Sequence, residues 1–230
     1  MRIQFSLYVL LSCVVLPCFS QTGISPQVDN RVRVEFETHY NAWMEWRENN
    51  RASSSLTENI PFKAIIALGP KALPFVIEKM NQQKNNFHLQ RAVREMSKKR
   101  FERNAWPVGK HGDSVSLAKM YTDWWNNDLA ITSDKVRALL ADKRSHEVSG
   151  NIEEASRITK QIENLGIAAL PEVFELIAGG ETSLVSTASM LTEGKLSNDA
   201  SAIACSQWWS ENKNSWSIPH PESPQTSYTK

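Results

Sequence analysis

The stretch Ala67 to Met80 reads ALGPKALPFVIEKM, and a close variant returns at Asn164 to Ile177 as NLGIAALPEVFELI. In both copies a Leu-Gly pair ends one apolar segment, and an Ala-Leu-Pro triplet begins the next. Glycine supplies the left-handed conformation that ends many helices, whereas proline is tolerated in the first turn of a helix. The phrase therefore predicts a helix, a tight turn and a second helix that packs back on the first.

The two copies belong to a longer internal repeat. Gly69 and Gly166 are 97 positions apart (166 − 69), whereas Trp124 and Trp208 are 84 apart (208 − 124). The first unit therefore carries thirteen extra residues (97 − 84), which we place in the loop 101–113. Each unit is long enough for two helical hairpins of ~40–47 residues, and such hairpins bury their apolar faces by stacking on one another.

Apolar residues recur every three or four positions through most of the chain, which is the spacing of one helix face. No segment shows the alternation that is typical of a half-buried β-strand. The predicted helices cover 29–49, 60–68, 72–80, 89–96, 114–125, 133–149, 152–165, 170–177, 184–191 and 199–210. We expect an all-α fold in which residues 28–127 form a first unit with its N-terminal helix, and residues 128–213 form a second unit.

The pattern "ALG, two or three residues, ALP, then an amphipathic helix" resembles that of bacterial HEAT-like helical-repeat proteins, most of them without an assigned function. The helix that carries Tyr121, Trp124 and Trp125 is similar to the closing helix of short members of that group. The resemblance covers roughly Thr57 to Trp209. It implies a HEAT-like α-solenoid of stacked antiparallel hairpins in two related units, and it implies no catalytic residue.

The N-terminus has the features of a signal peptide. Arg2 precedes an almost entirely apolar run over 3–16, and small residues stand before a predicted cleavage after residue 20. The run is shorter than the ~20 residues that span a bilayer, so we expect cleavage of 1–20, no remaining membrane span, and export to the periplasm or the medium. An uncleaved membrane anchor and a lipoprotein modified at Cys13 are the alternatives. Cleavage leaves Cys205 alone, without a disulfide partner.

The charge balance argues against a nucleic-acid partner. The chain has 26 Lys and Arg against 25 Asp and Glu, and loss of Arg2 makes the balance 25 to 25 (26 − 1). A general nucleic-acid binder needs excess basic charge to displace counterions from phosphates.

The last residues, 214–230, are rich in Pro, Ser and Thr, and this composition predicts a disordered tail. We expect the partner to be another protein.

No metal or cofactor motif is present in the sequence. The histidines, which form no His-x-x-x-His pair and no pair with cysteine at zinc spacing, are His39, His88, His111, His146 and His220. A basic run, Lys98-Lys99-Arg100 with Arg103, suits the C-terminal end of a helix, and binding of phosphate or of an acidic partner is the alternative. We therefore predict no bound cofactor.

Two helix starts are visible in the sequence. Ser55-Leu56-Thr57-Glu58 fits a capping box, in which the serine oxygen and the glutamate carboxylate each accept from a backbone N–H. Gly109 to Ser114 reads GKHGDS, which favours a flexible turn followed by an Asp or Ser N-cap. Because this stretch also brings Lys, His, Asp and Ser together, a hydrolase-type enzyme with its site in the loop 106–114 is the alternative function.

Eight tryptophans are the most unusual feature of the composition. In the adjacent pairs 124–125 and 208–209, side chains on a helix point about 100° apart, so one of each pair is expected in the core and one at an edge. The candidate interaction surface consists of Trp106, Lys110, His111, Trp125 and Trp209. The sequence therefore favours an exported, non-catalytic interaction or scaffold protein.

Overall fold

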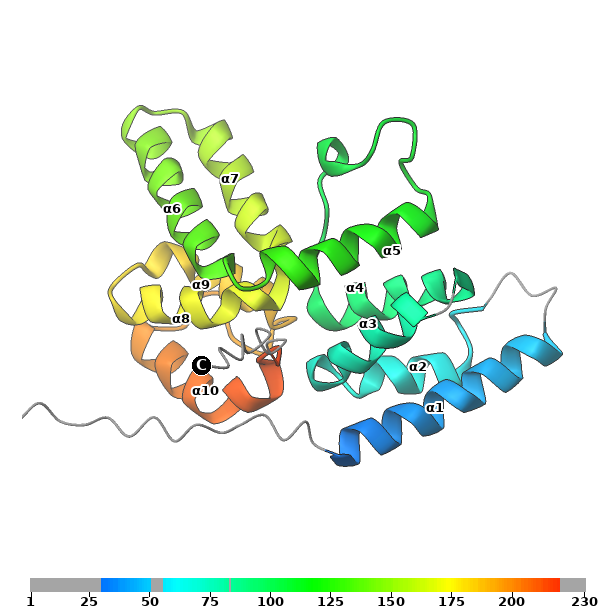
Figure 1. Ribbon diagram of the computed structural model, residues 1–230. Helices are drawn as coiled ribbons and strands as arrows, with labels where there is room; N and C mark the ends of the chain where they lie inside the picture. The colour runs from blue at the N-terminus through cyan, green and yellow to red at the C-terminus, as the bar shows by residue number, and fades with distance from the viewer. Residues whose placement is uncertain (1–29, 51–55, 83, 220–230) are drawn as a thin grey trace, which may run out of the picture.

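The computed structural model describes residues 30–50, 56–82 and 84–219. Within these ranges the chain forms ten α-helices and no β-strand, so the prediction of an all-α fold is confirmed (Figure 1). The predicted signal peptide 1–20, the Ser55 start of the predicted capping box and residues 220–230 of the predicted tail lie outside the described residues.

The helices follow the predicted spans closely. They are α1 (Asn30–Asn49), α2 (Ile60–Ala67), α3 (Leu73–Gln82), α4 (Gln90–Ser97), α5 (Ser114–Asp123), α6 (Thr132–Val148), α7 (Ile152–Asn164), α8 (Leu170–Ala178), α9 (Val185–Leu191) and α10 (Ala202–Trp216). Short 3₁₀ turns lie between them, namely η1 (Pro70–Ala72), η2 (Lys84–Leu89), η3 (Arg103–Ala105), η5 (Gly166–Ala169) and η6 (Thr182–Leu184). The last helix is longer than predicted and ends at Trp216.

Polar side chains fix the starts of several helices. The Asn59 side chain accepts from the backbone N–H of Phe62 at 2.9 Å, so Asn59 is the N-cap of α2 and the position predicted for the capping box is wrong. Pro61 occupies the first turn of α2, where the N–H that proline lacks would have no helical partner. Asp113 caps α5 by accepting from the Ser116 N–H at 2.9 Å.

The buried apolar residues form two clusters. The first gathers side chains from α1 to α5 and the turn after α5, from Phe36 to Leu129. The second gathers side chains from α6 to α10, from Val136 to Cys205. Ile218, which follows α10, packs against both clusters. In Figure 1 the first cluster corresponds to the blue-to-green helices on the right, and the second to the green-to-orange helices on the left.

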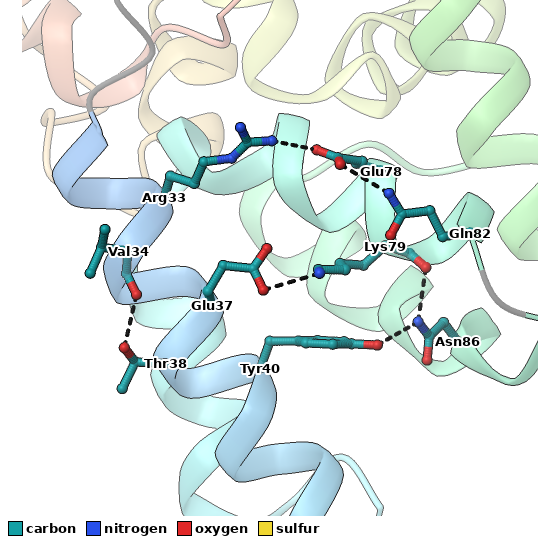
Figure 2. Close-up of polar contacts among 9 residues, drawn as sticks. All are labelled: Arg33, Val34, Glu37, Thr38, Tyr40, Glu78, Lys79, Gln82 and Asn86. Atoms are coloured by element: carbon teal, nitrogen blue, oxygen red, sulfur yellow. Dashed lines mark hydrogen bonds and ion pairs between the residues drawn. The ribbon is translucent and has the colours of Figure 1, made fainter.

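Polar contacts join α1 to α3 (Figure 2). Arg33 pairs with Glu78 at 2.9 Å and Lys79 pairs with Glu37 at 3.0 Å. The fully buried Asn86 donates to the Tyr40 hydroxyl at 2.7 Å and to the Lys79 carbonyl at 2.8 Å. A buried amide must be satisfied in this way, because an unpaired one would cost about 1–3 kcal/mol. These bonds fix the position of η2 against α1 and α3.

The corresponding contact in the second cluster uses a different side chain. Glu172 of α8 stands 97 positions after Phe75 of α3 (172 − 75). Arg33 of α1 lies 5.1 Å from the centre of the Phe75 ring, whereas Arg137 of α6 donates two hydrogen bonds, of 2.7 and 3.2 Å, to the buried Glu172 carboxylate. In both units an arginine contacts the residue that follows the Ala-Leu-Pro triplet, and it comes from the helix two before the one that carries this residue.

Backbone contacts join the two clusters at the second copy of the phrase. The Arg100 N–H donates to the Asn164 carbonyl at 3.0 Å. Gly166 has φ +75°, and a Cβ built on it would lie 2.2 Å from the Ser97 carbonyl oxygen and 2.5 Å from the Lys99 nitrogen. The chain therefore needs glycine here both for its conformation and for the close approach to the end of α4.

The prediction that one tryptophan of each adjacent pair lies deeper is wrong. Trp124 and Trp125 are both buried, because α5 continues into a π-turn, η4 (Trp124–Asp128), closed by the Leu129 N–H on the Trp124 carbonyl at 3.0 Å. A π-turn holds more residues than an α-turn, so neighbouring side chains are separated by a smaller angle. Trp208 and Trp209 are both half-buried, and their rings lie 5.7 and 4.7 Å from that of Phe174.

Over the described residues, no single helix has the length and apolar composition needed to cross a membrane. One bent pair, Ile60–Ala67 with Pro70–Gln82, passes by length and composition alone, with 97° between its two parts. Because α3 runs nearly perpendicular to α2, the prediction that the helix after the first copy of the phrase packs back on the helix before it is wrong.

Candidate functional site

A cleft of about 560 Å³ lies where the two clusters meet. The ends of α4, α7 and α9 form one part of its wall, and the loop after α4 together with α5 forms the other. Its lining residues are Arg94, Glu95, Lys98, Arg100, Phe101, Trp106, Leu117, Tyr121, Glu163, Asn164, Met190, Leu191 and Glu193. Its volume falls in the range of ~300–1,000 Å³ that is usual for ligand sites.

The cleft is bridged by an ion pair between two unusual backbone positions. Lys98 and Glu193 follow α4 and α9 respectively, and both have φ of +55°. Among the described residues they are the two non-glycine residues with positive φ, and their side chains pair with each other across the cleft. The contact links the end of α4 to the end of α9.

The three residues of the basic run have three different environments. Lys98 is paired with Glu193, whereas Arg100 lines the cleft and has no carboxylate within 4 Å among the described residues. Lys99 is half-buried, with its ammonium 5.0 Å from the centre of the Phe101 ring. Burial, together with a smaller effect of the Lys135 charge, lowers the pKa of Lys99 to about 8, against the opposing effects of Asp128 and Glu102.

The lowered pKa of Lys99 predicts a specific pH dependence of the free energy of unfolding. Between pH ~8 and the ordinary lysine pKa of ~10.4, the unfolded chain binds a proton that the folded chain does not, so this group makes stability rise with pH. Below pH ~8 Lys99 is charged in both the folded and the unfolded chain, so folding then bears the full free-energy cost of desolvating the charged lysine. We expect Lys99→Met to be more stable than the parent at pH 7, with an advantage that shrinks as the pH approaches 10. Urea unfolding at several pH values measures this difference.

The control for that measurement is Lys63→Met, because the Lys63 side chain is exposed on α2. Its stability should stay parallel to that of the parent across the same pH range. A constant difference between Lys99→Met and the parent from pH 7 to 10 would show that Lys99 is not desolvated in the folded chain.

Aromatic side chains form the apolar part of the cleft. Phe101 and Tyr121 meet edge to face at 5.0 Å, and the Tyr121 hydroxyl donates to the Lys99 carbonyl at 2.9 Å. Burial raises the pKa of the Tyr121 phenol above its ordinary value, so the hydroxyl remains a proton donor at neutral pH. Trp106 adds a half-buried indole, which offers contact area at low cost in side-chain entropy.

Three polar side chains of the cleft make neither a hydrogen bond nor an ion pair among the described residues. The Arg100 guanidinium and the Glu163 carboxylate make no ion pair there, and the Asn164 carboxamide makes no hydrogen bond. Burial raises the pKa of the Glu163 carboxyl, with a smaller opposing effect from Lys160. The cleft thus presents a free cation, a free carboxyl group and a free amide beside an aromatic wall.

The structure brings part of the predicted interaction surface together. Trp106 lines the cleft, and the His111 ring lies 5.0 Å from it, centre to centre. Lys110 is exposed in the same loop, and its N–H donates to the Pro107 carbonyl at 3.0 Å. Trp125 is buried in the first cluster and Trp209 packs on Phe174, so neither of these two lines the cleft.

The polar side chains of the loop contact the first turn of α5 and the Trp106 ring. The Asp113 carboxylate accepts from both the N–H and the hydroxyl of Ser116, and these bonds lower the pKa of Asp113. A nucleophile needs a base within hydrogen-bond reach, and in the described chain His111 makes no hydrogen bond to a serine or to Asp113. Cys205 is buried, and burial raises the pKa of its thiol. No group of three or more His, Cys, Asp or Glu residues within the described ranges could hold a metal ion.

Arg100, Glu163 and Asn164 were not predicted as site residues. Arg100 belongs to the basic run, which suits the C-terminal end of a helix, and Glu163 lies in no motif. Their meeting depends on the Arg100–Asn164 backbone bond, which joins positions 64 residues apart (164 − 100). The one local signal was the Leu-Gly pair, which marks where α7 ends.

Comparisons with protein-family models, with curated proteins and with solved structures found no match to this chain.

Proposed function

We propose that this protein is an exported, non-catalytic helical-repeat protein that binds a segment of another protein in the cleft between its two clusters. The observation that carries the proposal is the lining of the cleft. Unpaired groups of both charge signs, Arg100 and Glu163, lie with the free Asn164 amide beside Trp106 and Tyr121. A protein segment offers partners for all of these, since it has charged side chains, main-chain amides and apolar groups.

The proposed architecture is a HEAT-like arrangement of two related units. Helices α3, α4 and α5 have the same order and the same phrase as α8, α9 and α10. Lys98 and Glu193 end the second helix of each set with the same left-handed conformation. Arg33 and Arg137 cover equivalent positions of the phrase. Stacked repeats commonly bind protein partners on surfaces that several helices share.

Binding is favoured over hydrolysis by the use made of the loop residues. The Asp113 carboxylate caps α5, and the His111 ring packs against the Trp106 ring. Trp106 and His111 therefore form a packed pair at the rim of the cleft. Such a pair provides surface for a ligand and leaves no base positioned beside a nucleophile.

The proposal is tested by selecting phage-displayed random peptides on the immobilised protein and measuring their affinity by fluorescence anisotropy. Peptides that bind in the cleft should lose at least about tenfold in affinity on Arg100→Glu and on Trp106→Ala, because a central anchor and its charge partner carry most of the binding energy. Arg103→Glu is the matched control, since Arg103 is exposed in the same loop and does not line the cleft. Selected peptides that bind the parent and both cleft variants equally would refute the proposal.

A further inference from the structure

The methionines of the chain differ widely in their exposure to solvent. Five of the six lie among the described residues, namely Met44, Met80, Met96, Met120 and Met190. Met80 and Met96 are buried in the first cluster, with 6% and 4% of their surface exposed. Met190 is 59% exposed, and among the described methionines it alone has a side chain that is mostly in contact with solvent.

Met190 stands at the rim of the cleft. It lies in the last turn of α9, and its carbonyl accepts from the Glu193 N–H at 3.1 Å, so the backbone that carries the side chain is held in place. The side chain lines the cleft and also a second hollow, of about 360 Å³, that is lined by residues of α6, α7 and α9. Solvent therefore reaches the thioether from both hollows.

An exposed thioether is a target for two-electron oxidants such as peroxides. One oxygen atom passes from hydrogen peroxide to the sulfur, the O–O bond breaks as it takes up two electrons from the sulfur, and the rest of the peroxide leaves as water. Methionine sulfoxide reductases return the sulfoxide to the thioether. The thiol of Cys205 is also a possible target, but it is buried. Because the peroxide must reach the sulfur, the rate should follow the exposure of each side chain.

The position of Met190 decides what its sulfoxide changes. Oxidation turns a flexible apolar side chain into a polar one, and in a core this disrupts the packing. Met80 and Met96 pack in the first cluster, so their oxidation disturbs the fold. Met190 packs in neither cluster, so its sulfoxide remains in solvent and the core keeps its contacts. The change is then confined to the surface that lines the cleft.

We propose that Met190 is a reversible oxidation site, at which a peroxide converts the thioether to the sulfoxide and thereby weakens binding in the cleft. The second part rests on the proposed function and adds a regulation to it. In the reduced protein Met190 and Leu191 offer apolar surface at the rim of the cleft. A sulfoxide oxygen binds water, which an apolar group of the ligand must displace without replacing the hydrogen bond.

The site is tested by treating the protein with hydrogen peroxide and following each methionine by peptide mass spectrometry. Met190 should reach half-conversion at least about fivefold sooner than Met80 and Met96, because access to the sulfur limits the rate. Far-UV circular dichroism should be unchanged at the time when Met190 is converted. A rate at Met190 no greater than the rates at the two buried positions would overturn the site, as would a loss of helicity while Met190 alone is oxidised.

The effect on the cleft is measured with a peptide whose affinity falls on Trp106→Ala and which contains no methionine, cysteine or tryptophan. The peptide is added after the peroxide has been removed. Its affinity should fall at least about threefold on oxidation and return after treatment with a methionine sulfoxide reductase. Met190→Leu has no sulfur at this position, so the affinity of this variant should be the same before and after peroxide treatment.

The outcomes separate this inference from the proposed function. Unchanged affinity of the oxidised parent would overturn the regulation and leave the cleft as a peptide site. An equal fall in Met190→Leu would assign the effect to another residue and overturn the proposal. If no selected peptide requires the cleft, the proposed function fails and the regulation fails with it, whereas the mass spectra still decide whether Met190 is the oxidation site.

Discussion

Replacing Gly166 by alanine is expected to lower the free energy of unfolding by about 3–5 kcal/mol. About 1–2 kcal/mol of this comes from holding an L-residue at φ +75°, where its Cβ crowds the backbone. The rest comes from the contact with Ser97 and Lys99, since a Cβ would lie within 2.2–2.5 Å of their backbone atoms. Backbone atoms cannot turn aside as a flexible side chain does, so the ends of α4 and α7 must separate.

The matched control for this substitution is Gly150→Ala. Gly150 has φ +76°, and nothing lies within 4 Å of the Cβ position. Its substitution should cost about 1–2 kcal/mol, which is the backbone strain alone. Urea unfolding followed by far-UV circular dichroism gives both values. Equal losses at the two positions would mean that the close approach of Gly166 to the end of α4 contributes nothing to stability.

Replacing Trp43 by alanine is expected to cost about 3–5 kcal/mol. The indole is fully buried between Tyr40, at 6.0 Å from ring centre to ring centre, and Phe62, at 5.3 Å. Its Nε1–H donates to the Leu56 carbonyl at 2.8 Å, which ties α1 to the chain just before α2. Removing the ring therefore opens a cavity in the first cluster and leaves the carbonyl without this donor.

Trp46 provides the comparison, because it lies one turn further along α1 and is only half-buried. Trp46→Ala should cost about 1 kcal/mol, since less apolar surface leaves water at this position on folding. The same urea unfolding experiment measures both variants. A loss at Trp43 no larger than the loss at Trp46 would contradict the assignment of Trp43 to the centre of the first cluster.

Much of the helical structure could be predicted from the sequence because its signals are local. Helix spans follow from apolar spacing, and the ends at Gly69 and Gly166 follow from the freedom of glycine at positive φ. The exact starts do not follow from the sequence, since Asn59 and Asp113 compete with neighbouring Ser and Thr residues as caps. The burial of both Trp124 and Trp125 could not be predicted, because a π-turn has no marked sequence signal.

The candidate site was only partly predictable, for a related reason. Trp106 and His111 stand out by residue type in a glycine-containing loop, and they do lie together. Trp125 and Trp209 stand out equally, yet neither lines the cleft, because residue type does not tell which side of a helix is covered. Arg100 and Asn164 become neighbours only through a backbone bond between distant segments.

The phrase Leu-Gly followed by Ala-Leu-Pro by itself determined that one helix ends and another begins at each copy, since glycine ends a helix and proline fits a first turn wherever they occur. Only the tertiary structure decided that the two glycines have different roles. A Cβ on Gly69 would meet open space, whereas one on Gly166 would collide with the end of α4. Conformational preference is a property of a few adjacent residues, but close packing depends on which distant segment arrives at that point. The packing of the end of α4 against Gly166 also brings the ends of α4, α7 and α9 together, and the cleft lies between them.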